Sequence, residues 1–191
     1  MERKREATRI LLEEGLKELM KKYSFDKITV KMITDEAGVL RPTFYNYYRD
    51  KYELLEGVFR GDIEEQMRGL IQDNMEEEAL KVLFFRLERD KSFYKKAFEI
   101  TGQNSFEEIL KDRLYDMFLD YLSRNPLKKQ PGIRAWRKET IATYYAVSMT
   151  SVIREWMTNE QQNVSADAIL EGYHILMTHA IFDLIDKKEK P

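Results

Sequence analysis

The chain has 191 residues, enough to bury a substantial core, and it contains no Cys, which excludes disulfides and thiolate metal sites. A net charge of −2 argues against a protein coated by nucleic acid over its whole surface, although residues 1–60 hold 13 Lys and Arg against 11 Asp and Glu. The charged N-terminus and the lack of a long apolar run predict neither export nor membrane insertion, so we expect a cytoplasmic protein.

Helical periodicity extends through the chain. Only four Pro and eight Gly occur, and apolar residues recur at helical spacing with no alternating run typical of a strand. The first predicted helix carries a core-facing stripe from Ile10 to Met20 and ends near Tyr23. Thr29 is a good N-cap for a short second helix, and Gly38 is the residue expected where that helix stops.

A third helix is predicted to begin near Arg41, with Pro42 in its first turn, where a missing N–H has no cost. Asp50 followed by Glu53 is a capping-box pattern, which predicts the start of a long fourth helix. Two short helices joined by a Gly-containing turn are typical of a helix-turn-helix, whose second helix enters the major groove of DNA.

The rest of the chain is also predicted to be helical. Glu76 to Glu78 form a charge run that predicts a solvated helix start, and Ser165 is the expected N-cap of the last helix. We therefore expect an all-α fold of about nine helices, with a helix-turn-helix DNA-binding domain over 1–50 and a helical regulatory and dimerisation domain over 51–191. The five helices predicted beyond residue 75 span 76–88, 91–100, 105–123, 133–158 and 165–187.

Four aromatic side chains crowd the third predicted helix. Phe44 and Tyr48 are four residues apart and share one face, which indicates packing in the core. Tyrosine hydroxyls on the opposite, outward face could donate to DNA phosphates, whereas the alternative is that all four rings merely pack. The residues predicted on the outward face are Arg41, Thr43, Tyr45, Asn46 and Tyr47.

The stretch FDKITVKMITDEAGVLRPTFYNYYRDKYELL, residues 25–55, resembles the DNA-binding region of TetR/AcrR-type transcriptional regulators. Leu40 stands where these proteins often have a capping Ser, and Pro42 replaces a frequent Gly or Ala. The resemblance implies a homodimeric regulator of a palindromic operator in double-stranded DNA, and a repressor; an activator controlled by a protein partner is the alternative. It also implies that Lys31, Arg41, Thr43 and Asn46 face bases or nearby phosphates, while Tyr45, Tyr47 and Lys51 clamp the backbone.

The last two predicted helices are apolar on more than one side, which favours a four-helix interface between two chains, as the resemblance also implies. The alternative is a thick monomer core. The residues predicted to form the interface are Tyr145, Val152, Trp156, Ile169, Gly172, Tyr173 and Leu176.

The segment SFYKKAFEITGQNSFEEIL, residues 92–110, is similar to the dihydroxyacetone-kinase operon activator subgroup of this family. Rings are abundant between the 91–123 region and the start of 133–158, which favours an apolar pocket for a small-molecule effector, while the alternative is that they fill the core. The residues predicted to bind the effector are Phe93, Tyr94, Phe98, Gln103, Phe106, Tyr115, Phe118 and Trp136.

Catalysis has little support in the sequence. His174 and His179 are five residues apart and do not converge on a helix, and no nucleophile elbow, P-loop or dinucleotide fingerprint occurs. We expect neither a metal nor a cofactor and no enzymatic activity. Two alternatives are a binding module with a vestigial DNA-binding region and a helical enzyme such as a lyase.

Overall fold

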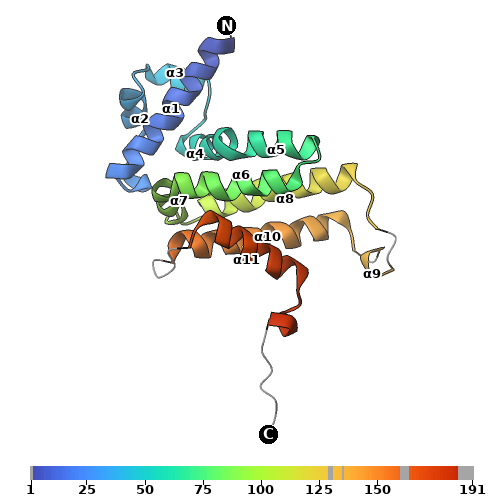
Figure 1. Ribbon diagram of the computed structural model, residues 1–191. Coiled ribbons are helices and arrows are strands. Elements are labelled where there is room, and N and C mark those ends of the chain that lie inside the picture. Colours follow the sequence, from blue (N-terminus) through green and yellow to red (C-terminus); the bar gives the residue numbers. More distant parts are fainter. Residues whose placement is uncertain (1, 129–130, 135, 160–163, 185–191) are drawn as a thin grey trace.

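The structure is a computed structural model that describes residues 2–128, 131–134, 136–159 and 164–184. These residues contain helices and no strand, which confirms the all-α prediction (Figure 1). The α-helices are α1 (Glu2–Lys22), α2 (Val30–Glu36), α3 (Arg41–Tyr45), α4 (Lys51–Phe59), α5 (Glu65–Gln72), α6 (Glu76–Arg89), α7 (Lys91–Phe98), α8 (Phe106–Arg124), α9 (Pro131–Arg134), α10 (Lys138–Thr158) and α11 (Ala166–Thr178).

Three shorter elements complete the described chain. Two are 3-10 helices, η1 (Phe25–Lys27) and η3 (Ile181–Leu184), and η2 (Arg60–Glu64) is a π-helical turn that links α4 to α5. With α4, η2 and α5 taken as one continuous helix and the four-residue α9 set aside, the described residues form nine main helices. We call α1–α3 the head and α5–α11 the body.

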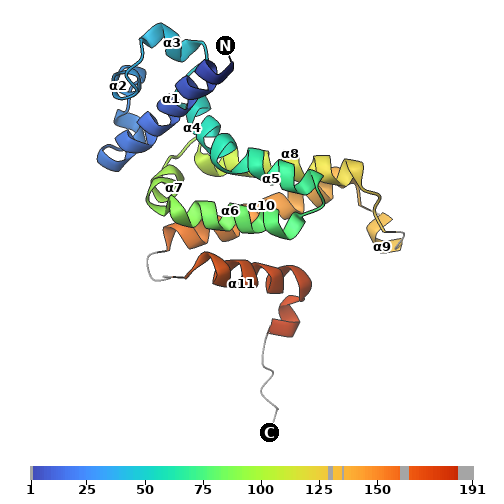
Figure 2. The ribbon, with the colours of Figure 1, turned by 45° about the horizontal axis from the view of Figure 1, so that its top comes forward.

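The head folds around a small core at one end of the molecule (Figure 2). Thr29 caps α2 by accepting a hydrogen bond from the Met32 N–H, and Gly38 adopts the left-handed conformation (φ 65°) just beyond the helix. The α1 stripe points inward from Leu12 to Met20, whereas Ile10, which the sequence assigned to the stripe, is 46% exposed. The core therefore begins two residues later along α1 than predicted, at Leu12.

The long helix α4–η2–α5 connects the head to the body. Asp50 caps α4 by accepting hydrogen bonds from the N–H groups of Tyr52 and Glu53, as the sequence predicts. Phe59 packs edge-on against Phe106 of α8, with ring centroids 6.1 Å apart. Because α4 contacts both α1 and α8, its residues belong to the cores of both parts.

The body is a stack of helices in which α5 lies beside α6, α8 beside α10, and α11 on the outer side of α6 (Figures 1 and 2). Phe84 of α6 contacts the rings of Trp156 of α10 and Tyr173 of α11, with centroids 5.9 and 6.0 Å away. The Trp156 indole N–H donates to the Val164 carbonyl at 2.8 Å, so its one polar group is satisfied inside this core.

Two predicted helices have different bounds in the structure. The segment predicted as one helix over 133–158 contains the short α9 and the separate α10, because Arg137 has an extended backbone (ψ 151°) that caps α10. The last helix was predicted to reach residue 187 but ends at Thr178, where the His179 backbone is extended (ψ 144°). The Thr178 hydroxyl donates to the carbonyl of His174, a side-chain bond that competes with helix continuation. Residues 185–187 lie outside the described residues.

Candidate DNA interface, body cavity and dimer face

The outward face of α3 is the candidate DNA-reading surface. Phe44 is fully buried and Tyr48 is 2% exposed, with their ring centroids 6.0 Å apart, so these two rings are core, as predicted. Arg41, Tyr45 and Asn46 are exposed on the other side of the helix, and Thr43 is half-buried. Leu40 occupies the N-cap position without a side-chain hydrogen bond, so the first N–H groups of α3 lack a cap from that side chain.

Arg41 and Tyr45 contact each other on this surface. The Arg41 guanidinium donates to the Tyr45 hydroxyl at 3.1 Å and its central carbon lies 5.7 Å from the ring centroid. A guanidinium held over a tyrosine ring keeps unused N–H donors, because only two of its nitrogens, Nε and Nη2, bond the hydroxyl. The pair therefore presents an oriented set of donors at the surface.

The other residues predicted to contact DNA differ in their exposure and in the groups that they contact within the protein. Lys31 is exposed and pairs with Asp35 at 2.6 Å, while Tyr47 is half-buried against the head core. The Lys51 ammonium donates to the carbonyls of Phe25, Asp26 and Ile28 at 2.8, 3.2 and 3.0 Å. Burial lowers the pKa of Lys51. In this structure all three donors of Lys51 are used to hold η1 against α4, a role that the sequence did not indicate.

A chain of polar contacts joins α1 to Tyr48, whose ring packs against α4. The Tyr48 hydroxyl donates to Glu13 at 2.7 Å, and Glu13 accepts from Arg9 at 3.0 Å. Burial raises the pKa of Glu13, and the hydrogen bond from Tyr48 partly offsets that effect. The Tyr48 ring lies directly on the backbone of Gly57, where a Cβ would come within 2.6 Å of Cε1. Only glycine allows this close approach without movement of the ring.

Charged groups also join the head to the body. Lys17 of α1 is largely buried, and its ammonium lies 2.5 Å from the Asp62 carboxylate in η2 and 3.6 Å from Asp90. Burial alone would lower the pKa of Lys17, but the bond to Asp62 and the nearby negative charges of Asp62, Glu14 and Asp90 together outweigh it, and the pKa is raised. Lys96 of α7 donates to the carbonyls of Met20 and Lys21 at 2.7 and 2.9 Å, which satisfies acceptors at the C-terminus of α1.

The π-helical turn carries a second buried carboxylate toward the body. Glu64 is 1% exposed and accepts two hydrogen bonds from Arg113 at 2.9 and 2.7 Å and one from Arg68 at 2.7 Å. Burial would raise the pKa of Glu64, but the bonds from Arg113 and Arg68 outweigh it and the pKa is lowered. Asp62 and Glu64 thus direct two neighbouring carboxylates of η2 to opposite partners, one in the head and one in the body.

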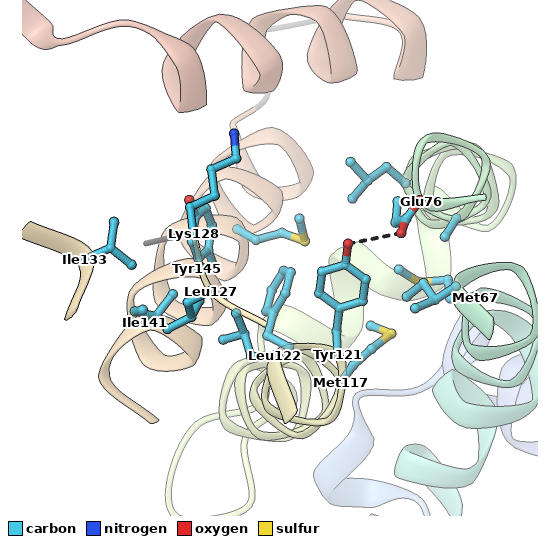
Figure 3. Close-up of a pocket in the computed structure, with 15 residues that line it drawn as sticks. Met67, Glu76, Met117, Tyr121, Leu122, Leu127, Lys128, Ile133, Ile141 and Tyr145 are labelled. Atoms are coloured by element: carbon cyan, nitrogen blue, oxygen red, sulfur yellow. Dashed lines mark hydrogen bonds between the residues drawn. The ribbon is translucent and has the colours of Figure 1, made fainter. Parts of the chain in front are cut away.

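The body encloses a cavity of about 480 Å³ between α5, α6, α8, α9 and α10. Its wall is mostly apolar, and its polar groups are few: Glu76 accepts a hydrogen bond from the Tyr121 hydroxyl at 3.0 Å, and Lys128 lies at the edge (Figure 3). This volume and composition are typical of a site for a small organic ligand. The apolar wall includes Met67, Ile71, Met117, Phe118, Ile141 and Met149.

The structure brings few of the predicted effector residues to this cavity. Phe118 lines it, whereas Tyr115 and Trp136 line two smaller pockets and Gln103 is exposed. Four predicted residues pack around one another in the core, and neighbouring ring centroids among them lie 5.0 to 5.5 Å apart: Phe93, Tyr94, Phe98 and Phe106. The alternative that the rings fill the core therefore describes these four residues.

Sequence reasoning missed the methionines and the Glu76–Tyr121 pair. The charge run at Glu76 was interpreted as solvated, yet Glu76 is half-buried while Glu77 is exposed. The sequence could have indicated part of this wall, because Met117 and Tyr121 on α8 are four residues apart and therefore share one face of the helix.

The predicted dimer residues divide into four groups. Trp156 and Tyr173 are buried within the protomer, and Tyr145 lines the body cavity. Val152, Ile169 and Gly172 are half-buried, and Leu176 is 48% exposed. Further apolar side chains are exposed on the same two helices, at Tyr144 (63%), Val147 (49%) and Ile175 (42%). The apolar surface of α10 and α11 thus exceeds what the protomer core covers.

Neither a metal site nor a membrane-spanning helix is found among the described residues. Residues 2–128, 131–134, 136–159 and 164–184 include no group of three His, Asp or Glu placed to hold a metal ion. In that part of the chain, no helix combines the length and the apolar character needed to cross a membrane.

Two family models match the chain. Residues 12–58 match the model described as bacterial regulatory proteins, tetR family, and residues 73–179 match the model described as transcriptional regulator C-terminal region. The chain belongs to the TetR family. It is therefore a DNA-binding transcriptional regulator and not an enzyme.

Comparison with individual proteins agrees with this assignment. The chain is 29% identical over 152 residues, 78% of each sequence, to the HTH-type dhaKLM operon transcriptional activator DhaS of Lactococcus lactis subsp. lactis (strain IL1403). A solved structure of the dihydroxyacetone kinase operon activator DhaS has the same fold, with a TM-score of 0.62 and 24% identity. The match covers 89% of this chain and 93% of that structure.

Proposed function

We propose that this TetR-family regulator binds a palindromic operator in double-stranded DNA as a homodimer, with α3 in the major groove. The observation that carries the proposal is the division of α3, which buries Phe44 and exposes Arg41, Tyr45 and Asn46 on one outward surface. On this proposal residues 1–50 form the DNA-binding domain and residues 51–191 the regulatory and dimerisation domain, with α4 packed against both.

Each outward side chain has a proposed role set by its chemistry. Arg41 and Asn46 carry donors suited to base edges, and Thr43 suits a base or a nearby phosphate. Tyr45 and Tyr47 have hydroxyls that suit phosphate oxygens. Lys31 contacts the DNA backbone once its ion pair with Asp35 is broken. A phosphate contact by Lys51 requires it to give up one of its three carbonyl partners, so its main contribution is to hold η1 in place.

The proposed dimer interface is the exposed apolar surface of α10 and α11. Leu176, Ile175 and Val147 are each more than two-fifths exposed, which is unusual for aliphatic side chains grouped on neighbouring helices of one protomer. Pairing this surface with a second copy would bury them in a four-helix arrangement and place two heads on one side of the duplex.

The body cavity is the proposed effector site. Helices α6 and α8 line it. The end of α6 connects to the head through the Asp90–Lys17 contact, and α8 connects through the Arg113–Glu64 pair to η2, the turn between the head and the body. An effector that fits the cavity better at one head position changes operator affinity, and DNA changes effector affinity by the same factor.

The sign of regulation has two candidates. Repression is the interpretation drawn from the sequence resemblance. Activation is favoured by the curated relative, which is named as an operon transcriptional activator. Control of an activator by a protein partner is the alternative that the sequence left open. In vitro transcription from a promoter that carries the selected operator distinguishes the two, since a repressor lowers transcript yield and an activator raises it.

The α3 proposal is tested by comparing two variants on DNA selected from random duplexes. Arg41→Ala should relax the preference at one base pair of each half-site by about 1–3 kcal/mol, because it removes a donor to a base edge. Tyr45→Phe should weaken binding to all sequences alike, because it removes a phosphate contact. Lys81→Ala, on α6 of the body, is the matched control and should change neither property. If the Arg41→Ala profile equals the wild-type profile, α3 does not read bases through Arg41.

A further inference from the structure

The body cavity has an asymmetric distribution of charge. Among the described residues that line it, the charged ones are Glu76 on α6 and Lys128 in the segment that follows α8. Figure 3 places Glu76 beside Tyr121 on one side, while Lys128 lies near Tyr145 on the other side. Lys128 is exposed, whereas Glu76 is half-buried against an apolar wall. A ligand that enters the cavity therefore meets negative charge inside and positive charge only at the edge.

Glu76 has room for a further partner. Among the described residues its carboxylate accepts one side-chain hydrogen bond, from Tyr121, and forms no ion pair. Tyr121 donates this bond from a neutral phenol, and the bond to Glu76 raises the pKa of that phenol. A half-buried carboxylate held by one neutral donor favours a second, cationic partner, because two acceptor oxygens offer more sites than one hydroxyl fills.

The rest of the wall also suits a cation with an apolar body. The aromatic rings of Phe118, Tyr121 and Tyr145 line the cavity, and such rings attract an ammonium group through their faces. Three methionines complete the wall, and their flexible, polarisable side chains adapt to ligands of different shape. The three are Met67, Met117 and Met149.

We propose that the body cavity binds an amphipathic cation, an apolar molecule with one amine or quaternary ammonium group, and that Glu76 is its counter-charge. This inference rests on the proposed effector role of the cavity and specifies its ligand class. An anionic amphiphile is disfavoured because its head group could approach only the exposed Lys128, which is already hydrated, while its tail would desolvate Glu76 without replacing the lost water.

The position of Glu76 in the first turn of α6 offers a purely structural reason for a carboxylate there, since acidic residues stabilise helix N-termini. Glu77 occupies the same turn but is exposed and does not line the cavity. A comparison of Glu76→Gln with Glu77→Gln therefore separates the two roles, because both variants lose one charge from the helix start and only one loses it from the cavity.

The test uses calorimetry on the full chain without DNA, with three probes that share one alkyl tail: decyltrimethylammonium, decanol and decanoate. Wild type should bind the ammonium probe most tightly. Glu76→Gln should weaken that binding about tenfold and leave decanol binding unchanged, because the neutral probe makes no ion pair. Tyr121→Phe should weaken ammonium binding less, and Glu77→Gln and Lys128→Gln should leave it within about twofold of wild type.

Several results would overturn the proposed ligand class. These are decanoate binding as tightly as the ammonium probe, no binding of any probe to wild type, or equal losses in Glu76→Gln and Glu77→Gln. The effector role is judged separately by operator affinity with and without the ammonium probe. Tight, Glu76-dependent binding that leaves operator affinity unchanged would support the ligand class and contradict the effector role.

Discussion

The substitution Gly57→Ala examines how the head is held against the long helix. A Cβ at position 57 would lie 2.6 Å from Cε1 and 2.8 Å from the hydroxyl of Tyr48, distances that real Cβ atoms do not show. The ring is buried and its hydroxyl bonds Glu13, so it cannot swing into solvent without breaking that bond. Overpacking costs about 1–3 kcal/mol and the lost bond about 0.5–1.5 kcal/mol, against about 1 kcal/mol gained when Ala replaces Gly inside a helix.

We therefore expect Gly57→Ala to lower the free energy of unfolding by about 2 kcal/mol, measured by urea denaturation with circular dichroism. Gly69→Ala, on α5, is the control, because a Cβ there meets no atom within 4 Å. That variant should be as stable as wild type or more stable by up to about 1 kcal/mol. If Gly57→Ala and Gly69→Ala shift the urea midpoint equally, the close contact between Tyr48 and α4 does not exist in solution.

Two further predictions concern the body. Glu64→Gln should lower the free energy of unfolding by about 3 kcal/mol at neutral pH, because it leaves two arginines without their buried partner. The pKa of Glu64 is lowered on folding, so its contribution to stability is present above the usual pKa of 4.5 and is lost as the pH falls through the folded pKa. Urea titrations at several pH values should therefore show the stability difference between wild type and Glu64→Gln shrinking below about pH 4.5. Leu176→Glu should produce monomers in sedimentation at micromolar concentration, because it puts a charge into the proposed interface, whereas Tyr23→Glu, at an exposed ring of the head, should remain dimeric. A wild-type chain that sediments as a monomer would refute the interface.

Local sequence signals predicted the helices well because the interactions that begin and end them are local. Thr29, Asp50 and Ser165 each cap the helix that the sequence assigned to them, and Gly38 ends α2 with a positive φ. The separation of Phe44 and Tyr48 from the outward face of α3 followed from helical spacing alone. These features depend on residues within four positions of one another.

The body cavity could not be predicted in the same way. An apolar stripe indicates that a side chain is buried, but not whether it meets another side chain or an empty space. Phe106 and Phe118 both lie on α8, yet Phe106 packs against Phe59, Tyr94 and Phe98 while Phe118 faces the cavity. The difference arises from how α6 and α10 lie against α8, which depends on contacts between residues far apart in the chain.

The π-helical turn also depends on tertiary contacts. Nothing in the spacing of Arg60 to Glu64 distinguishes it from the α-helical residues on either side. In the structure this turn directs Asp62 to Lys17 and Glu64 to Arg113, partners that are 45 and 49 positions away. Insertions of this kind inside α-helices often occur at functional sites, and here the turn lies where the head meets the body.

The central claim is that α3 and its symmetry mate read DNA, and selection of binding sites from random duplexes by the purified wild-type chain tests it most directly. The account predicts an enriched palindrome whose half-sites are centred one helical turn, or a multiple of it, apart, with the most conserved bases at the position that Arg41→Ala relaxes. Enrichment of no sequence, or of a single asymmetric site bound equally well by Arg41→Ala, would contradict it.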